Sequence, residues 1–275
     1  MQSTQDIQRK IRTVRNIQQI CRAMKTVSSI KLRKAEERFR QAQPYADALQ
    51  QAVFSLAGVE GNHPLLEIRE VQRTGVVAIS ADKGLAGSYN TNIIREATTL
   101  VRSLGEVGVI PLGRRITENF RRHEFAIEAS ISPLGSMPEF RGIAILADQI
   151  GDLYTSGSFD RVLLVYNRFG KGVVTEQLLP IEPIGAEETP GDFIFEPNPD
   201  AILQQLLPRY LRTLLYSSVL SAIAAEHAAR VAAMSLATEN ADDLISQLTM
   251  DYNKSRQSAI TRELTDIVGA AEALT

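Results

Sequence analysis

The feature that most constrains the fold is a run of 60 residues, from Arg209 to Val268, that contains neither glycine nor proline. These residues are the usual breakers of helices, so the run predicts one continuous helix, about 90 Å long at roughly 1.5 Å per residue. Its longest uncharged stretch, 213–225, has 13 residues, whereas about 20 are needed to span a bilayer. We therefore expect a coiled-coil helix and no membrane crossing.

A second long helix is predicted at the start of the chain, where the first proline is Pro44 and the first glycine is Gly58. Pro44 is expected to kink this helix or to mark a weak joint. Apolar or small residues recur at helical spacing before it: Ile7, Ile11, Val14, Ile17, Cys21, Met24, Val27, Leu32, Ala35, Phe39 and Ala42.

The C-terminal run carries a matching stripe in which small residues dominate the middle. Its members are Leu207, Leu211, Leu214, Ser218, Ala222, Ala225, Ala229, Ala232, Leu236, Leu244 and Leu248. Small residues allow two helix axes to approach closely, and spacings of three and four suit a left-handed antiparallel pair. We expect the two terminal helices to form an antiparallel coiled coil.

The middle of the chain has the alternating pattern of an α/β domain. Strands are expected at 75–81, 107–112, 161–169 and 173–181, with a further candidate at 126–131, and helices at 91–104, 116–122 and 140–154. This order predicts a mainly parallel sheet covered by helices, with a hairpin at its edge. An acidic, proline-rich linker, 182–199, follows.

The predicted fold class is therefore α/β plus a long α-helical antiparallel coiled coil, with the α/β domain inserted between the two helices. We expect an N-terminal helix over 1–58, a central α/β domain over 70–185 and a C-terminal helix over 200–275.

Charge is unevenly distributed along the chain, although the net charge is only −2. Residues 1–40 hold 11 Lys or Arg against 3 Asp or Glu, whereas residues 172–208 hold 7 acids and no base. A charge run usually forms a solvated helix face, but one of a single sign also suits an acidic partner or a nucleic acid.

Signals for catalysis or for a bound metal or cofactor are weak. Cys21 is the only cysteine, the three histidines are scattered, and no G-x-S-x-G motif occurs. The segment "DKGLAGSYN", Asp82–Asn90, follows a predicted strand as phosphate-binding loops do, but it lacks their motifs. We interpret Gly84 and Gly87 as turn residues or partner contacts, and we expect no cofactor, no metal and a reducing cytoplasmic setting.

Four stretches resemble the gamma subunits of F-type ATP synthases, of the bacterial type without the chloroplast regulatory cysteines. They are "IRTVRNIQQICRAMKTVSSIKLRKAEERF", "SADKGLAGSYNTN", "RYLRTLLYSSVLSAIAAEHAARVAAMSLATEN" and "NKSRQSAITRELTDIVGAAEAL". The resemblance implies a non-catalytic rotor shaft that couples ion-driven rotation of a membrane ring of c subunits to ATP synthesis or hydrolysis in a ring of three alpha and three beta subunits. The α/β domain would be a foot that docks on epsilon and the c ring, at the cytoplasmic face of a bacterial plasma membrane.

The resemblance also implies contact residues. Met24, Lys25, Arg33 and Lys34 would contact the acidic lever of beta, and Arg256, Gln257, Thr261 and Glu263 the beta catch region. Tyr210 would lie where the foot meets the rotor ring, and the apolar end Ile267–Leu274 would fit an apolar socket. Arg212 departs from the family, which often has Glu at this position. Lys83 takes the place of the arginine in the family's usual Asp-Arg-Gly, which here reads Asp82-Lys83-Gly84.

Two other readings remain open. The first is an α/β enzyme that binds a phosphorylated ligand at Asp82–Asn90 and uses the coiled coil to oligomerise. The second is a basic coiled-coil adaptor for nucleic acid, whose binding would be sensitive to salt.

Overall fold

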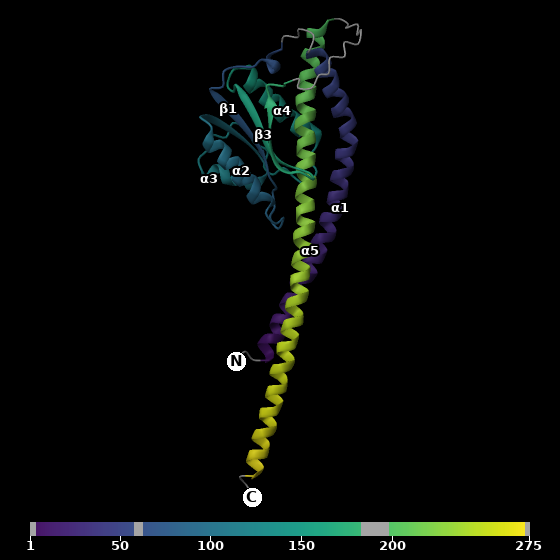
Figure 1. The fold of residues 1–275 in the computed structure, drawn as a ribbon, viewed down its shortest axis with the longest axis vertical. Helices are drawn as coiled ribbons and strands as arrows, with labels where there is room; N and C mark the ends of the chain where they lie inside the picture. Colours follow the sequence, from purple (N-terminus) through teal and green to yellow (C-terminus); the bar gives the residue numbers. More distant parts are fainter. Residues whose placement is uncertain (1–3, 58–62, 183–197, 273–275) are drawn as a thin grey trace. The chain divides into compact units, whose positions relative to one another are not determined.

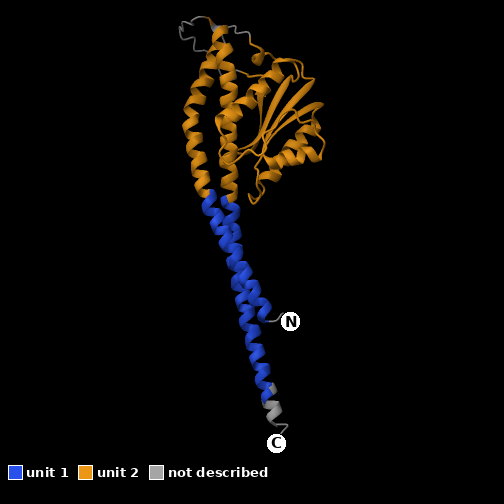
Figure 2. Cartoon of the chain, turned by 180° about the vertical axis from the view of Figure 1, so that it is seen from behind, with its two compact units in different colours: residues 1–28, 231–275 blue, residues 29–230 orange. Residues whose placement is uncertain are grey.

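The computed structural model describes residues 4–57, 63–182 and 198–272, and it divides into two compact units (Figure 2). Unit 1 consists of residues 1–28 and 231–275, and unit 2 of residues 29–230. Two helices, α1 (Thr4–Ala57) and α5 (Pro199–Glu272), contribute to both units.

In unit 1, α1 and α5 run side by side in opposite directions (Figure 1), as the sequence predicts. Within unit 1 the buried and half-buried positions of α1 are Thr4, Ile7, Ile11, Val14, Gln18, Cys21, Met24 and Ser28. Two residues of the predicted stripe are misplaced, because Ile17 is 50% exposed and Val27 is 53% exposed. The seam of a coiled coil repeats every 3.5 residues, and that period places Gln18 and Ser28 inward instead.

The seam on α5 also differs from the predicted stripe. In unit 1 the residues turned toward the seam are Met234, Thr238, Ala241, Ile245, Leu248 and Tyr252, which alternate in steps of four and three. The predicted Ala232, Leu236 and Leu244 are exposed, whereas Leu248 is placed correctly. Several neighbouring faces of this helix carry apolar residues, so its own pattern does not single out the face that α1 covers.

A buried polar residue lies within this seam. The side-chain amide of Gln18, only 8% exposed, donates a hydrogen bond to the carboxylate of Asp242, and Arg22 lies 3.4 Å from the same carboxylate. A buried amide with one partner on the opposite helix disfavours other registers of a coiled coil, because a slip would leave it unpaired.

Unit 2 contains a four-stranded sheet in the order β2 (Glu106–Leu112), β1 (Arg73–Ile79), β3 (Arg161–Arg168) and β4 (Gly172–Leu179). The first three strands are parallel, and β4 pairs antiparallel with β3 at the edge. This is the predicted mainly parallel sheet with an edge hairpin. The candidate strand at 126–131 is wrong, because this segment makes only two isolated bridges, Val109 to Ile127 and Leu112 to Ile131.

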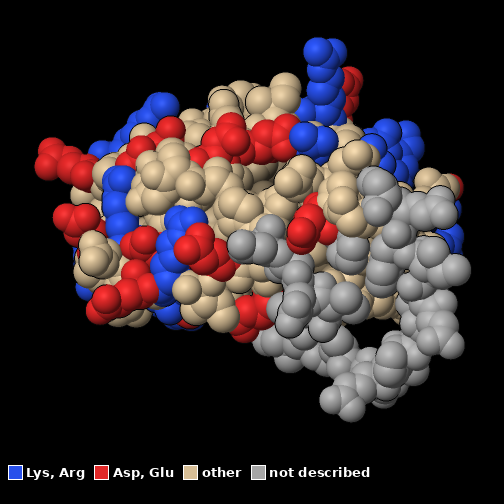
Figure 3. Space-filling view, turned by 90° about the horizontal axis from the view of Figure 1, so that it is seen from above, with Lys and Arg blue, Asp and Glu red and all other residues tan. Residues whose placement is uncertain are grey.

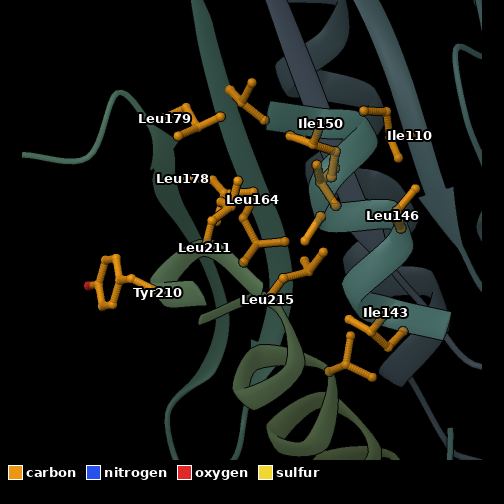
Figure 4. Close-up of a cluster of buried hydrophobic side chains, with 14 of the residues drawn as sticks. Ile110, Ile143, Leu146, Ile150, Leu164, Leu178, Leu179, Tyr210, Leu211 and Leu215 are labelled. Atoms are coloured by element: carbon orange, nitrogen blue, oxygen red, sulfur yellow. The ribbon is translucent and has the colours of Figure 1, made fainter. Parts of the chain in front are cut away.

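Helices cover both faces of the sheet (Figure 1). On one face, α2 (Tyr89–Ser103) and α3 (Arg114–Arg122) pack on alternate strand residues such as Val76 and Val109. On the other face, α4 (Phe140–Thr155) and α5 pack on the intervening residues, such as Ile110 and Leu164 (Figure 4). Both faces are buried, as expected of parallel strands that read as continuous apolar runs.

The boundaries of the compact units differ from those of the predicted domains, because the α/β part shares one hydrophobic core with parts of both long helices. Leu49 and Val53 of α1 and Leu211 and Leu215 of α5 belong to the same buried cluster as Ile150 of α4. The division 1–58, 70–185 and 200–275 therefore stays a prediction. The linker at 182–199 lies almost wholly outside the described residues.

Three further features bear on the helices. Pro44 lies inside α1 and Pro208 inside α5, and each helix continues past its proline.

Within the described part of the chain, Asp200–Thr265 is long and apolar enough by composition to cross a membrane. Of its most apolar window, 61% is buried inside the protein, as in the core helix of a soluble protein. A short 3-10 helix, Pro64–Leu66, precedes β1.

The observed seam of unit 1 can be tested with two substitutions that lie two residues apart. Met234→Ala should lower the free energy of unfolding by about 2–5 kcal/mol, because it removes a buried side chain that is 5% exposed. Leu236→Ala should change it by about 0.5 kcal/mol or less, because Leu236 is 58% exposed. Urea unfolding of both variants measures the difference, and a larger loss for Leu236→Ala would contradict the assigned seam.

Candidate functional site

The predicted contact residues on α1 are accessible. In unit 1, Lys25 is exposed and Met24 is half-buried beside the seam. In unit 2, Arg33 and Lys34 are both exposed, as an outward-facing pair requires. Their predicted contacts with a partner stay predictions.

The predicted contact residues near the end of α5, Arg256, Gln257, Thr261 and Glu263, are all exposed. The hydroxyl of Thr261 donates to the backbone carbonyl of Gln257 over 3.0 Å. Ile267, the first residue of the apolar end, is 61% exposed. The side chains of residues 268–274 lie outside the description, so the predicted apolar socket contact is not addressed there.

An exposed apolar stripe on α1 in unit 1 was missed by sequence reasoning. Ile17, Ile20 and Val27 are 50%, 59% and 53% exposed, and their spacing of three and seven places them on one helix face. Ile17 and Val27 had been assigned to the seam. The signal was present in the sequence, because two apolar faces at helical spacing are more than one partner helix can cover.

The loop Asp82–Asn90 is held by its own side chains. The carboxylate of Asp82 accepts hydrogen bonds from the backbone amides of Arg114, Leu134 and Gly135, over 2.9, 3.0 and 2.7 Å. Asn90 accepts from the amide of Ala81 and donates to the carbonyl of Lys83. These bonds make Asp82 and Asn90 structural supports of the loop.

The glycines of this loop have different roles. Gly87 has φ +55°, in the left-handed region that favours glycine, and the exposed Leu85 beside it also has a positive φ, +60°. The carbonyl of Gly84 instead accepts hydrogen bonds from the guanidinium of Arg230 on α5, over 3.3 and 3.2 Å. Gly87 is thus the turn residue that the sequence predicts.

The loop packs directly on α5 within unit 2. Ala81, Ala86, Tyr89 and Ile93 form a buried cluster with Ala225, and the hydroxyl of Tyr89 donates to the carbonyl of Ala222 over 2.9 Å. Burial raises the pKa of Tyr89 well above its ordinary value, so the phenol stays a hydrogen-bond donor. The small Ala225 had been expected to face another helix, but it allows this loop to approach.

Arg230 is the centre of a buried polar cluster on α5. Its guanidinium forms an ion pair with Glu226 at 2.7 Å and lies 3.1 Å from Nδ1 of His227, in addition to its two bonds to Gly84. The side chains of Arg230 and Glu226 are only 8% and 12% exposed. Burial raises the pKa of Glu226, and the positive charges of Arg230 and Lys31 oppose that shift.

His227 is neutral in this cluster. Arginine can only donate, so Nδ1 of His227 accepts and the ring hydrogen lies on Nε2, which is buried and has no partner among the described residues. Burial, and then the charges of Arg230 and Lys31, lower the pKa of His227 to about 4. The cluster therefore keeps one charge state of this histidine near neutral pH.

Tyr210, the predicted foot contact, is buried. It is 7% exposed and packs edge-on against Phe54 of α1, with ring centres 6.4 Å apart. Arg212, which departs from the family pattern, forms an ion pair with Asp148 of α4 at 2.5 Å. Both residues of that pair are partly exposed, so it contributes little stability.

The neutral His227 predicts how stability depends on pH. In the unfolded chain this histidine has its ordinary pKa of 6.5 and binds a proton below that pH. In the folded chain it binds a proton only below about pH 4. The neutral His227 therefore contributes up to about 3 kcal/mol to the free energy of unfolding above pH 6.5, and this contribution is lost as the pH falls toward about 4. Urea unfolding measured between pH 7 and 4 should show this loss of stability in the native chain and a smaller loss in His227→Gln. An equal change of the free energy of unfolding with pH in both proteins would contradict a neutral, buried His227.

Comparisons with known proteins cover the whole chain. The family model described as ATP synthase matches residues 3–274. The ATP synthase gamma chain of Heliobacterium modesticaldum is 40% identical over 290 residues, an alignment that covers all of both chains.

Two solved structures have the same fold. A chain of the Euglena gracilis mitochondrial ATP synthase, from the OSCP/F1/c-ring structure in rotational state 3, matches with a TM-score of 0.76 at 18% identity, over 98% of this chain and 94% of that one. A chain from the rotor of the same organism's enzyme, in rotational state 1, matches with a TM-score of 0.69 at 18% identity, over 94% and 98%. Taken with the family model and the full-length relative, these observations establish that the chain belongs to the ATP synthase gamma chain family.

Proposed function

We propose that this chain is the central rotor shaft of an F-type ATP synthase and that it carries no catalytic site itself. It couples ion-driven rotation of a membrane ring of c subunits to ATP synthesis or hydrolysis in a surrounding ring of three alpha and three beta subunits. The full-length match to a gamma chain, which includes both long helices and the α/β part, carries this proposal.

The mechanism follows from the asymmetry of a helical pair inside a nearly three-fold ring. Each beta subunit meets a different face of the shaft, and each face favours a different conformation and nucleotide affinity. Rotation moves these differences in contact energy from one site to the next, which is coupling in the thermodynamic sense. A helix without glycine or proline between 209 and 268 suits this role because it resists bending.

The proposed contacts to the alpha and beta ring combine charge with apolar surface. The exposed Lys25, Arg33 and Lys34, with Met24, would meet the acidic lever of beta, and the exposed Ile17 and its neighbours would add apolar contact area. The exposed residues of the α5 end would meet the beta catch region: Arg256, Gln257, Thr261 and Glu263.

The proposed foot docks on epsilon and the rotor ring. Since Tyr210 is buried, it offers little surface of its own to that ring. We infer that Tyr210 supports this contact by packing on Phe54, and that the exposed Gln204, Gln205 and Arg209 present most of the surface. The assembled enzyme is membrane-bound, and we place this chain peripherally, on the cytoplasmic face of a bacterial plasma membrane.

Neither alternative is favoured by the structure. A phosphate would meet the carboxylate of Asp82, which already holds three backbone amides of the neighbouring segments. A nucleic-acid adaptor needs a continuous basic surface, but in unit 1 α5 contributes Glu239, Asp242 and Asp243 beside the basic α1. The face of the protein seen in Figure 3 likewise intersperses acidic and basic side chains.

Charge reversal tests the contact to beta. Arg33→Glu with Lys34→Glu should lower coupled turnover of the assembled complex severalfold, because both exposed side chains would then repel an acidic lever. The matched control is Arg121→Glu with Arg122→Glu on α3, an equal change in charge at two exposed residues. Unchanged ATP hydrolysis and ion pumping in the first variant would count against the contact.

Subunit composition tests the function as a whole. The tagged chain is isolated gently from the membranes of its host, and native mass spectrometry identifies and counts its partners. One copy of this chain with three alpha and three beta subunits is the expected result. A homo-oligomer that is reproducibly free of those subunits would refute the proposal.

A further inference from the structure

We propose that Arg230 is a positioning residue that fastens the loop Asp82–Asn90 to α5, so that this loop keeps one position on the helix when the rotor turns. The inference rests on the proposed rotor function. It assigns the buried cluster around Arg230 a role in keeping rotation and catalysis in step.

The guanidinium of Arg230 makes several contacts in different directions. Within one guanidinium, Nε and Nη2 both reach the carbonyl of Gly84, Nη2 also meets Glu226, and Nη1 meets His227. A planar guanidinium presents its donors in a rigid fork, so Glu226 and His227, both on α5, hold it in one orientation toward the carbonyl of Gly84 in the loop. Lysine, with a single flexible ammonium, cannot reproduce that arrangement.

The cluster around Arg230 is buried. The ion pair with Glu226, also on α5, fixes the guanidinium that bonds to the loop, and the side chains of Arg230 and Glu226 are only 8% and 12% exposed. Replacing a buried pair by apolar residues is often neutral or favourable for stability, so stability alone does not account for an arginine here. Removing one partner of such a pair, in contrast, is strongly destabilising because it leaves an uncompensated buried charge.

The same loop has a second attachment to α5. The hydroxyl of Tyr89 bonds to the carbonyl of Ala222, eight residues before Arg230 and so about 12 Å away along the helix. Between the two bonds, Ala225 packs against Ala81 and Ala86 without a bulky side chain in the way. Two polar attachments on either side of a close apolar contact prevent both sliding and rotation of the loop on α5.

The test uses Arg230→Gln in the assembled complex, reconstituted into sealed lipid vesicles. Two quantities are measured: hydrogen exchange of the backbone amides of residues 83–87, and the ratio of ions pumped to ATP hydrolysed. We expect exchange at least about tenfold faster and a pumping ratio lowered about threefold or more, with ATP hydrolysis largely retained. Arg230→Lys should give intermediate values of both.

The control is Arg73→Gln. Arg73 forms an ion pair with Glu128, at 2.5 Å and about one-third exposed, and both residues of this pair belong to the α/β part and not to α5. Arg73→Gln should leave both the hydrogen exchange of residues 83–87 and the pumping ratio unchanged. A purely structural role of Arg230 would lower the thermal stability of the complex, and pumping and hydrolysis together, without changing their ratio.

Each outcome decides the proposal. Unchanged exchange in Arg230→Gln overturns the fastening of the loop, and faster exchange with an unchanged pumping ratio overturns its role in coupling. If Arg230→Gln does not assemble, Arg230→Lys decides by the same two measurements. If the native chain itself is found without alpha and beta subunits, the proposed function fails, and the exchange measurement still tests the fastening of the loop in the species that forms.

Discussion

The structure of unit 2 depends on the burial of one face of α5 against the parallel sheet and α4. Leu211 and Leu215 lie in the same core as Ile150 and Leu164, and side chains of this size each contribute about 1.5–3 kcal/mol when they are fully buried. Because α1 packs into this core as well, through Leu49 and Val53, the α/β part is not an independent attachment on a helical pair. The sheet, α4 and both long helices share one interior.

The kind of side chain that α5 buries changes along the helix, first toward the sheet and α4 and then toward the loop Asp82–Asn90. Where α5 meets the sheet and α4 its buried residues are mostly large and apolar, but from Ala222 to Arg230 they are small or polar apart from Ile223. Small side chains let the loop Asp82–Asn90 approach, and a buried arginine then donates hydrogen bonds to the half-buried carbonyl of Gly84. The same segment thus combines close approach with directional bonding.

Much of the fold and part of the candidate site could be predicted from the sequence. The parallel strands were recognisable because both of their faces are buried, and the long helices because they lack breakers. The accessible positions of Arg33 and Lys34 and the turn role of Gly87 followed from residue type alone. The burial of Tyr210 and the cluster around Arg230 could not be predicted, because the partners Phe54 and Gly84 lie more than 100 residues away in the chain.

By itself, the sequence determined the element types, the antiparallel pairing of the two long helices and the mainly parallel sheet, since these depend on local periodicity, on matching helix stripes and on short connections between strands and helices. Only the tertiary structure decided which of several apolar faces becomes buried. Leu236 and Ile17 are exposed while Thr238 and Gln18 turn inward, because the face a helix buries depends on where its partner lies. Ala225 fits a helix or a loop equally well by size, and the loop's approach in three dimensions selected one of them.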